Sequence, residues 1–282
     1  MGGWFLSDDA NDFRKFEIPA GTTIPANGYA VFQEDTHFGA GNPRTPFALS
    51  ENGETVFLTS GAGGFLTGYS DEEAFGASET NISLGRYFKA STNTYNFVAL
   101  ESATPGGPNA NPKVGPIVIS EIMYHPQDAP AGNPDAEYIE LYNLTTAPIT
   151  LQDVETRATW RLSGGVDLSF PRNTTIPPQG RLLIVRDEVS FNSAYNPGAA
   201  PVLRWDTGKL DNGGERIQLS MPGDVDDDGV RQYIRVDRVV YDDEAPWPTS
   251  PDGEGGALHR KQLDAYGNDV ANWQAGPPSP GN

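Results

Sequence analysis

The sequence predicts an all-β protein made of two tandem β-sandwich modules, and three observations support this. The 282 residues include 32 glycines and 24 prolines, and these two residue types interrupt long helices. Short β-branched or aromatic runs recur about every 8 to 12 residues between turn-forming residues, which is the strand spacing of a sandwich or barrel. No window of about 11 residues or more has an apolar stripe with the helical period.

The second half of the chain contains the clearest predicted strands. Each is an apolar or aromatic run bounded by turn residues, and they cover residues 117–123, 137–142, 181–185, 217–219 and 233–241. Within residues 233–241, Ile234, Val236, Arg238 and Val240 share one face, as in a half-buried strand. Residues 187–195 predict a single helical turn.

Two stretches of the chain repeat each other in the same order. Thr22-Thr23-Ile24-Pro25 recurs as Thr174-Thr175-Ile176-Pro177, and each copy leads into an apolar run that predicts a strand, at residues 29–32 and 182–185. Three further pairs follow in order: residues 52–58 with 213–219, 71–74 with 242–245, and 104–106 with 279–281. Two copies of one module explain this series most simply.

A proline-containing linker separates the two copies. We place the first module at residues 1–111, the linker at 112–116 and the second module at 117–282. The second module opens with two predicted strands that the first module lacks, so the first module has an unpaired sheet edge. We therefore expect that the chain is a fragment of a longer protein, or that a strand from another chain or a missing segment completes module one.

Several segments resemble the bacterial lamin-tail-type domain. In the second module they are residues 119–124, 137–143, 175–180, 247–248 and 256–258, which read ISEIMY, EYIELYN, TIPPQG, WP and GAL. In the first module, residues 4–9, 16–28 and 83–87 resemble the same domain without its opening strands. The resemblance covers nearly the whole chain and implies two tandem immunoglobulin-like β-sandwiches, a fold that serves as an accessory module of large secreted or cell-surface bacterial proteins. It brings no shared catalytic residues, and some relatives lie beside enzymatic domains.

Composition argues against several functions and partners. The net charge of −19 repels phosphate backbones and anionic lipids, so we expect no nucleic-acid partner. The absence of cysteine removes disulfides, thiolate metal sites and cysteine nucleophiles. The apolar runs are far shorter than the roughly 20 residues of a membrane helix, and the N-terminus does not resemble a signal peptide. We expect no membrane insertion and an extracellular or cell-surface location, as part of a longer exported protein.

The sharpest local motif is the acidic run at residues 224–229, which reads DVDDDG. Asp224, Asp226 and Asp228 stand at positions 1, 3 and 5 of a calcium loop, with glycine at position 6. Position 12 is Arg235, where an EF-hand has a bidentate glutamate, so any ion needs a further ligand. Two interpretations stay open, a weak calcium site and a solvated hairpin tip.

Other polar and aromatic residues have structural as well as functional interpretations. Glu121 and Glu140 lie in apolar strands, where a carboxylate needs a partner. We expect them to bond backbone groups or arginine, or to face solvent, rather than to form an acid pair or an ion site. The histidines have no metal-like spacing, and no Gly-x-Ser-x-Gly elbow occurs. The five tryptophans suit either a core or a carbohydrate platform, with Trp247 expected to be the exposed one.

The sequence thus predicts a non-catalytic structural, adhesive or protein-binding module that presents loops and sheet edges on a rigid scaffold. The expected partner is a protein or a cell-surface polymer, and calcium at the acidic loop is the one expected cofactor. Two alternatives remain: a calcium-stiffened spacer, and a carbohydrate-binding accessory region of a larger secreted enzyme.

Overall fold

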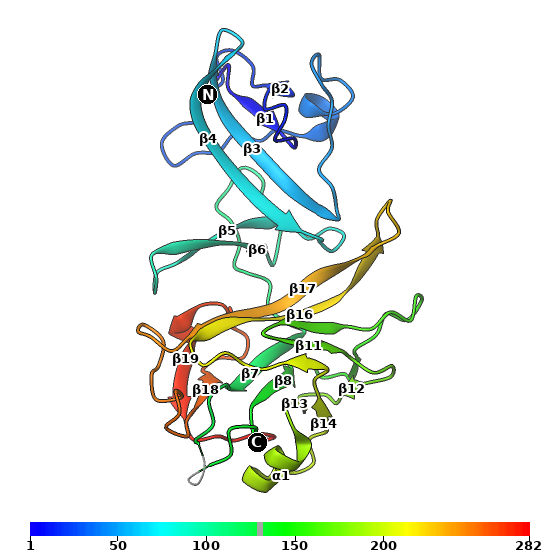
Figure 1. Ribbon diagram of the computed structural model, residues 1–282. Coiled ribbons are helices and arrows are strands. Elements are labelled where there is room, and N and C mark those ends of the chain that lie inside the picture. The colour runs from blue at the N-terminus through cyan, green and yellow to red at the C-terminus, as the bar shows by residue number, and fades with distance from the viewer. Residues whose placement is uncertain (129–131) are drawn as a thin grey trace. The chain divides into compact units, whose positions relative to one another are not determined.

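The computed structural model describes residues 1–128 and 132–282, and nearly all of its regular structure is β-strand (Figure 1). The predicted all-β class is therefore confirmed. The chain divides into two compact units, which are described separately: unit 1 comprises Met1–Tyr87, Asn96–Pro112 and Gly223–Gln232, and unit 2 comprises Phe88–Tyr95, Lys113–Pro222 and Tyr233–Asn282. Within the described ranges, no helix has the length and apolar character needed to cross a membrane.

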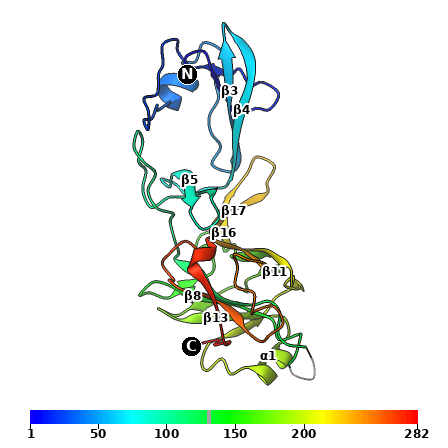
Figure 2. The same cartoon turned by 90° about the vertical axis from the view of Figure 1, so that its left-hand side faces the viewer.

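Unit 1 contains a four-stranded antiparallel sheet with the strand order β2-β1-β3-β4. A long hairpin, clear in Figure 2, supplies its last two strands, and the chain then forms a separate two-stranded sheet of β5 and β6. The elements are β1 (Phe5–Ser7), β2 (Phe16–Glu17), the π-helix η1 (Glu34–Phe38), β3 (Gly53–Ala62), β4 (Phe65–Gly76), β5 (Leu84–Lys89) and β6 (Thr94–Ala99).

The core of unit 1 is small and aromatic. Phe16, Ile18, Phe38 and Phe47 are each 8% exposed or less, and the rings of Phe38 and Phe47 stack with centroids 4.8 Å apart. Partly buried apolar side chains surround this cluster, among them Phe32. The β3–β4 turn falls at Gly63 and Gly64, whose φ angles are 58° and 82°.

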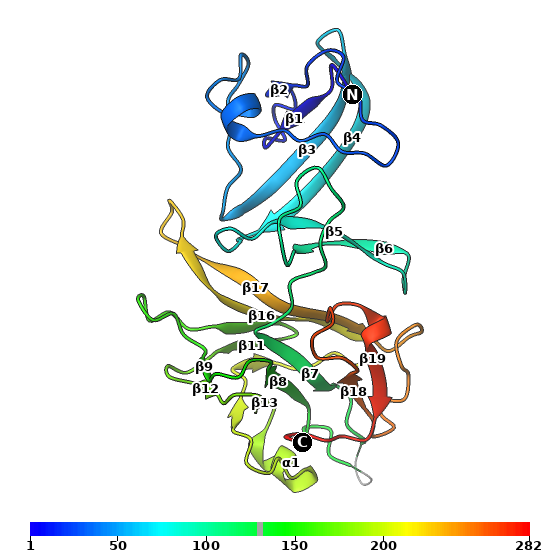
Figure 3. The same ribbon diagram turned by 180° about the vertical axis from the view of Figure 1, so that it is seen from behind.

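Unit 2 is built from two larger sheets (Figure 3). One has the order β14-β13-β8-β7-β18-β19 and the other β15-β11-β10-β16-β17, and β9 and β12 form a separate pair. The elements are β7 (Ile117–Met123), β8 (Tyr138–Asn143), β9 (Ile149–Thr150), β10 (Arg161–Gly164), β11 (Val166–Ser169), β12 (Thr175–Ile176), β13 (Arg181–Val185), α1 (Glu188–Ala194), β14 (Val202–Arg204), β15 (Thr207–Gly208), β16 (Gly214–Val225), β17 (Arg231–Asp242), β18 (Ala257–Arg260), the 3-10 helix η2 (Val270–Asn272) and β19 (Trp273–Gly276). By the division given above, residues 223–232 of the β16–β17 hairpin belong to unit 1, and residues 88–95 of the β5–β6 hairpin belong to unit 2.

The main core of unit 2 lies between these two sheets. Ile139 and Leu182 from the six-stranded sheet, and Ile217, Leu219 and Val239 from the five-stranded sheet, are 1% exposed or less in one cluster. Inward side chains alternate with outward ones along the strands, as in other sandwiches, except in β7, where a bulge between Ile119 and Glu121 places both Ile119 and Ile122 on the core face. A second cluster forms on the outer face of the six-stranded sheet, which α1 covers.

Most strands of unit 2 lie where the sequence predicts them, and β13 has the predicted bounds. The predicted helical turn is also confirmed as α1, whose N-cap Asp187 accepts a hydrogen bond from the N–H of Ser190 at 2.8 Å. The buried face of β17 is the one that carries Asp237, Val239 and Tyr241.

One predicted strand, residues 29–32, is wrong, because these residues are not in a sheet. Tyr29 and Val31 are 51% and 45% exposed. Its counterpart in the repeat, β13, pairs along its length with β8, and unit 1 has no strand in that place in its described residues. Without a partner for its N–H and C=O groups, an apolar run does not form a strand.

Candidate functional site

Two buried glutamates face each other on the outer side of the six-stranded sheet. Glu121 of β7 and Glu140 of β8 are direct Cα partners in the antiparallel register. They are 3% and 2% exposed, and by strand alternation they share the face opposite to the main core. Two like charges placed in this way destabilise a sheet unless other groups donate hydrogen bonds to them.

The C-terminal segment supplies these hydrogen bonds. The backbone N–H of Ser279 donates to Glu121 Oε1 at 2.8 Å, and its hydroxyl donates to Glu121 Oε2 at 3.0 Å. The backbone N–H of Gly281 donates to Glu140 Oε2 at 2.8 Å. In Figures 1 and 3 the C-terminus accordingly ends in the same region of unit 2 as α1 and β8.

Neighbouring side chains complete the set of donors. Ser120 Oγ and Arg181 Nε donate to Glu140 Oε1 at 2.6 and 3.0 Å, and the hydroxyl of Tyr138 donates to Glu121 Oε1. Burial is the main cause that raises the pKa of Glu140, against the hydrogen bond from Ser120. Burial and the charge of Glu121 raise the pKa of Tyr138.

All four carboxylate oxygens of this pair therefore accept hydrogen bonds from the chain itself. A general acid or base has to reach a proton of a substrate, and here residues 279–281 occupy that position. His259 Nε2 lies 3.7 Å from Glu121 Oε1, beyond hydrogen-bond distance. We call Glu121, Glu140 and residues 279–281 the glutamate clasp. Of the expected structural partners, both glutamates accept hydrogen bonds from backbone N–H groups, and Glu140 also bonds an arginine, Arg181.

Glu137 makes a similar structural connection at the start of β8. Arg186 Nη1 donates to Glu137 Oε1 at 2.6 Å, and the N–H of Leu210 donates to Glu137 Oε2 at 2.8 Å. Burial raises the pKa of Glu137. These contacts join the start of β8 to the segment that precedes β16.

The acidic run lies at the turn between β16 and β17. Asp226 Oδ1 accepts hydrogen bonds from the N–H groups of Asp228 (3.1 Å) and Val230 (2.8 Å), and its Oδ2 accepts one from Gln232 Nε2 (2.6 Å). These bonds, above all that from Val230, lower the pKa of Asp226. In the described part of the chain no group of three or more His, Cys, Asp or Glu side chains is arranged to hold a metal ion. Calcium binding by Asp224, Asp226 and Asp228 stays a prediction.

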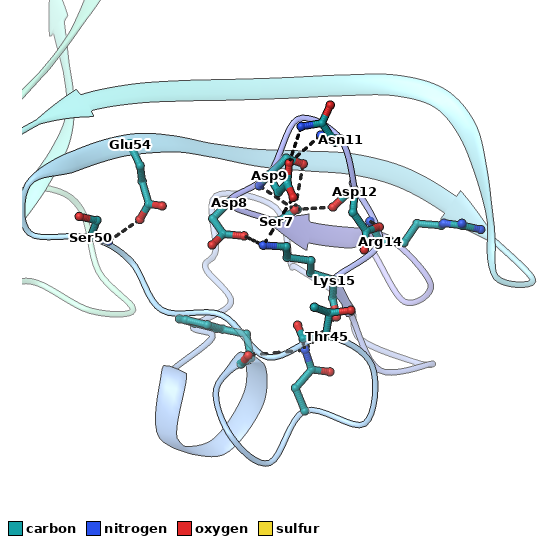
Figure 4. Close-up of polar contacts among 12 residues, drawn as sticks. Ser7, Asp8, Asp9, Asn11, Asp12, Arg14, Lys15, Thr45, Ser50 and Glu54 are labelled. Atoms are coloured by element: carbon teal, nitrogen blue, oxygen red, sulfur yellow. Dashed lines mark hydrogen bonds and ion pairs between the residues drawn. The ribbon is translucent and has the colours of Figure 1, made fainter. Parts of the chain in front are cut away.

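A second polar cluster fixes the loop between β1 and β2 in unit 1 (Figure 4). Lys15 Nζ lies 2.6 Å from Asp8 Oδ1, and Ser7 Oγ donates to the carbonyl of Asp12 at 2.6 Å. Asp9 accepts a hydrogen bond from the backbone N–H two residues further on, which lowers the pKa of Asp9. Because these contacts connect neighbouring residues of one loop, they order the loop.

The tryptophans of unit 2 belong to its core. Trp160, Trp205 and Trp273 are 7% exposed or less. The expectation that Trp247 is exposed is wrong, because it packs against the main core with its ring centroid 6.2 Å from that of Trp273. Trp4, in unit 1, packs against the aromatic core there. No flat aromatic platform is formed by these five side chains, so the carbohydrate alternative loses its expected site.

The two-sheet core places unit 2 in the class of immunoglobulin-like β-sandwiches. Residues 110–242 match the Lamin Tail Domain family, which is non-enzymatic, and the resemblance seen in the sequence is confirmed for that part of the chain. No curated protein and no solved structure matches the chain. The family match ends with β17, so β18, β19 and residues 279–281 of the glutamate clasp lie beyond it.

The sequence did not predict which groups donate hydrogen bonds to Glu121 and Glu140. Ser279 and Gly281 belong to a Ser-Pro-Gly run that recurs as Thr104-Pro105-Gly106 in the first repeat. That recurrence was the available signal, because a short motif that recurs in the same order along the chain predicts a shared structural role.

Acidification from pH 7.5 to about 5 is expected to raise the melting temperature. Burial raises the pKa values of Glu54, Glu137, Glu140 and Glu215 above the ordinary 4.5, so the folded chain binds protons before the unfolded chain does. Stability is then gained as pH falls through the folded-state values and is fully gained near pH 4.5. The loss of net negative charge acts in the same direction.

The trend should reverse in stronger acid. The pKa values of Asp9, Asp187 and Asp226 are lowered from 3.8 by hydrogen bonds, and the stabilisation that they provide is lost as pH falls below 3.8. Thermal melts followed by circular dichroism between pH 3 and 8 test both the expected rise in melting temperature down to about pH 5 and the expected fall in stronger acid. A melting temperature that falls steadily from pH 7.5 to 5 contradicts the burial of these glutamates.

Proposed function

We propose that the chain is a non-catalytic structural or protein-binding module of a bacterial secreted or cell-surface protein. In this proposal it contains two copies of one lamin-tail-type sandwich, and the first copy lacks its opening strands. The observation that carries it is the glutamate clasp, in which the best candidates for acid–base chemistry hold the chain's own C-terminal segment. The family match over residues 110–242 supports the same conclusion.

The strand order supports the two-copy part of the proposal. In unit 1 the sheet order is β2-β1-β3-β4, and in unit 2 four strands follow one another as β11-β10-β16-β17. β3 contains the sequence repeat of β16, and each of the two long hairpins pairs next with a short strand from earlier in its unit. At the starts of β3 and β16, Gly53 and Gly214 have positive φ angles of 97° and 102°. A Cβ on Gly53 would lie 2.6 Å from the carbonyl of Phe75, and one on Gly214 would lie 2.6 Å from the carbonyl of Tyr241. The two hairpins therefore have the same register.

Hydrogen bonds in the turns repeat as well. Each of the following contacts in unit 1 has a counterpart in unit 2: Gly28 N to Pro25 O (2.9 Å) and Gly180 N to Pro177 O (3.0 Å); Thr22 Oγ1 to Pro19 O (2.8 Å) and Thr174 Oγ1 to Pro171 O (2.7 Å); Gly107 N to Thr104 O (3.0 Å) and Asn282 N to Ser279 O (3.1 Å). Shared turn geometry at repeated sequence favours one ancestral module over chance likeness.

Unit 1 also offers a surface for a protein partner. β4 is an edge strand of its sheet, and Phe65, Leu66 and Tyr69 on it are 73%, 43% and 55% exposed. Open sheet edges with apolar side chains are sites where another chain adds a strand or packs a surface.

The proposal is tested by measuring binding and turnover with the full chain. We expect saturable binding to a bacterial secreted protein or cell-wall polymer in a purified panel, and a weaker signal after Phe65→Ser and Leu66→Ser. The same panel should bind Glu121→Gln as it binds the native chain, because this substitution lies inside the glutamate clasp.

Turnover decides against the enzymatic alternative. Chromogenic ester, glycoside and peptide substrates should show no hydrolysis above background. Hydrolysis by the native chain that is lost in a folded Glu121→Gln variant contradicts the proposal, because it assigns chemistry to the glutamate pair.

A further inference from the structure

An ion pair in unit 2 binds the backbone of β7. Arg260 Nη1 lies 2.6 Å from Asp237 Oδ2, and the two side chains are 0% and 6% exposed. Asp237 Oδ2 accepts a hydrogen bond from the N–H of Ile119 at 2.9 Å, and Arg260 Nη1 donates to the carbonyl of Ile119 at 3.2 Å. The ion pair between Asp237 and Arg260 is therefore buried, and its hydrogen bonds to Ile119 hold β7 in place within the six-stranded sheet.

Unit 1 contains an ion pair at the corresponding positions, but no strand there corresponds to β7 among the described residues. The hairpin register pairs Gly53 with Gly76 and sets Gly214 against Asp242, so Asp71 of β4 corresponds to Asp237 of β17. The pairing of residues 71–74 with 242–245 expected from the sequence is therefore wrong by five residues, because the strand register and not the acidic run sets the correspondence. The repeat of β18 in β5 places Arg86 where Arg260 is. Arg86 Nη2 lies 3.2 Å from Asp71 Oδ2, but these side chains are 45% and 38% exposed. The arginine also contacts Glu73 at 2.8 Å. No strand covers this pair among the described residues of unit 1.

Beside this pair, unit 1 has a pocket of about 550 Å³ with a mixed polar and apolar lining, whose apolar side includes Leu49, Val56, Phe75 and Leu84. The residues that repeat these four in unit 2 are buried in the main core: Leu210, Ile217, Tyr241 and Leu258. Leu49 is 47% exposed, whereas Leu210 is 1% exposed.

In unit 2, side chains of β7 and of the residue that follows it occupy the region that corresponds to this pocket. Tyr241, the repeat of Phe75, stacks on Tyr124 with ring centroids 4.7 Å apart, and Ile119 and Ile122 of β7 belong to the same core cluster. The pocket in unit 1 is thus lined by the residue positions that side chains of β7 and its extension cover in unit 2.

A third feature is the turn at residues 104–107. It has the same internal hydrogen bond as the turn held by the glutamate clasp, and Gly106 has a φ of 76° where Gly281 has 84°. In unit 2 the N–H groups of this turn donate to Glu121 and Glu140. In unit 1, no acceptor is present for the N–H of Thr104 or Gly106 within the described residues.

We infer that unit 1 binds an extended β-strand supplied from outside residues 1–282. The strand has apolar side chains on one face that enter the pocket, spaced as Ile119 and Ile122 are across the bulge of β7. Its backbone bonds Asp71 and Arg86, and its glutamate accepts hydrogen bonds from the turn at Thr104. In chemical terms the ligand is a segment like Ile119-Ser120-Glu121-Ile122. The inference rests on the two-copy part of the proposed function and names the partner of unit 1.

The inference is tested with the full chain and a fluorescein-labelled peptide with the sequence of residues 116–124, PIVISEIMY, followed by a lysine-rich solubilising tail. Fluorescence anisotropy is expected to show saturable binding. Arg86→Ala and Asp71→Asn should each weaken binding by at least about tenfold, and Arg14→Ala, an exposed residue of unit 1, serves as the matched control. A peptide with aspartate at the positions of Ile119 and Ile122 should not bind.

A second experiment attaches the strand to the chain covalently, so that binding can be detected even where the free peptide binds weakly. Residues 113–145 are joined through a glycine-serine linker in front of Met1, and hydrogen exchange at Thr104 and Gly106 is compared with that of the untethered chain. Slower exchange is expected, and Arg86→Ala should reverse it. Unchanged exchange together with no peptide binding, or binding that is indifferent to Arg86 and Asp71, overturns the inference. Such a failure is separate from failure of the proposed function, whose binding and turnover tests use the chain alone.

Discussion

Replacing Glu140 with alanine is expected to lower the free energy of unfolding of unit 2 by about 3 kcal/mol, because it leaves buried donors without an acceptor. The N–H of Gly281, the hydroxyl of Ser120 and the guanidinium of Arg181 all donate to this side chain. For a unit of this size such a loss lowers the melting temperature by about 6 to 12 °C. Urea unfolding followed by tryptophan fluorescence measures the free energy, since Trp160, Trp205 and Trp273 are buried in unit 2.

Glu155→Ala is the matched control, because Glu155 is an exposed glutamate of the same unit. Its effect should be within about 0.5 kcal/mol, as for most surface substitutions. Equal stability of the Glu140 and Glu155 variants contradicts the role given to the glutamate clasp.

Replacing Arg260 with methionine is expected to lower the free energy of unfolding by about 3 to 5 kcal/mol, because it leaves the buried carboxylate of Asp237 without its charge partner. The substitution also removes the donors to the carbonyls of Ile119 (3.2 Å) and Ala265 (2.6 Å). Differential scanning calorimetry should show the loss in the transition of unit 2.

The double variant Arg260→Met with Asp237→Asn isolates the cause. Asparagine removes the buried charge and keeps an oxygen that accepts from the N–H of Ile119, so we expect the double variant to be more stable than Arg260→Met alone. Arg172→Met, at an exposed arginine, should change little. A double variant that is less stable than either single variant contradicts the burial of an unpaired charge as the cause.

Much of the fold of unit 2 could be predicted from local pattern. Residues 117–123 and 181–185 form strands with the predicted bounds because β-branched runs between turn residues favour strands. Residues 29–32 have the same kind of apolar pattern and do not form a strand, because strand formation depends on a partner that lies elsewhere in the chain. The local sequence does not show whether a neighbouring strand is available for pairing.

The candidate site was predictable in part. A glutamate within an apolar strand predicts a bonded partner, and this holds for Glu121 and Glu140. The identity of the partner depends on a contact over about 140 to 160 residues of chain, between β7 or β8 and residues 279–281. Motif spacing does not predict contacts between residues so far apart in the chain. The recurrence of the Ser/Thr-Pro-Gly run, in contrast, points to residues 279–281 as a segment with a structural role.

Hydrogen exchange at four backbone amides tests the account most directly. The two units contain a turn with the same internal hydrogen bond, and in unit 2 its N–H groups donate to Glu121 and Glu140, whereas in unit 1 no glutamate among the described residues accepts from it. We expect the amides of Ser279 and Gly281 to exchange about 100-fold or more slowly than unstructured amides, and those of Thr104 and Gly106 to exchange near the unstructured rate. Equal protection of the two turns, or rapid exchange at Ser279 and Gly281, contradicts a closed second module beside an open first one.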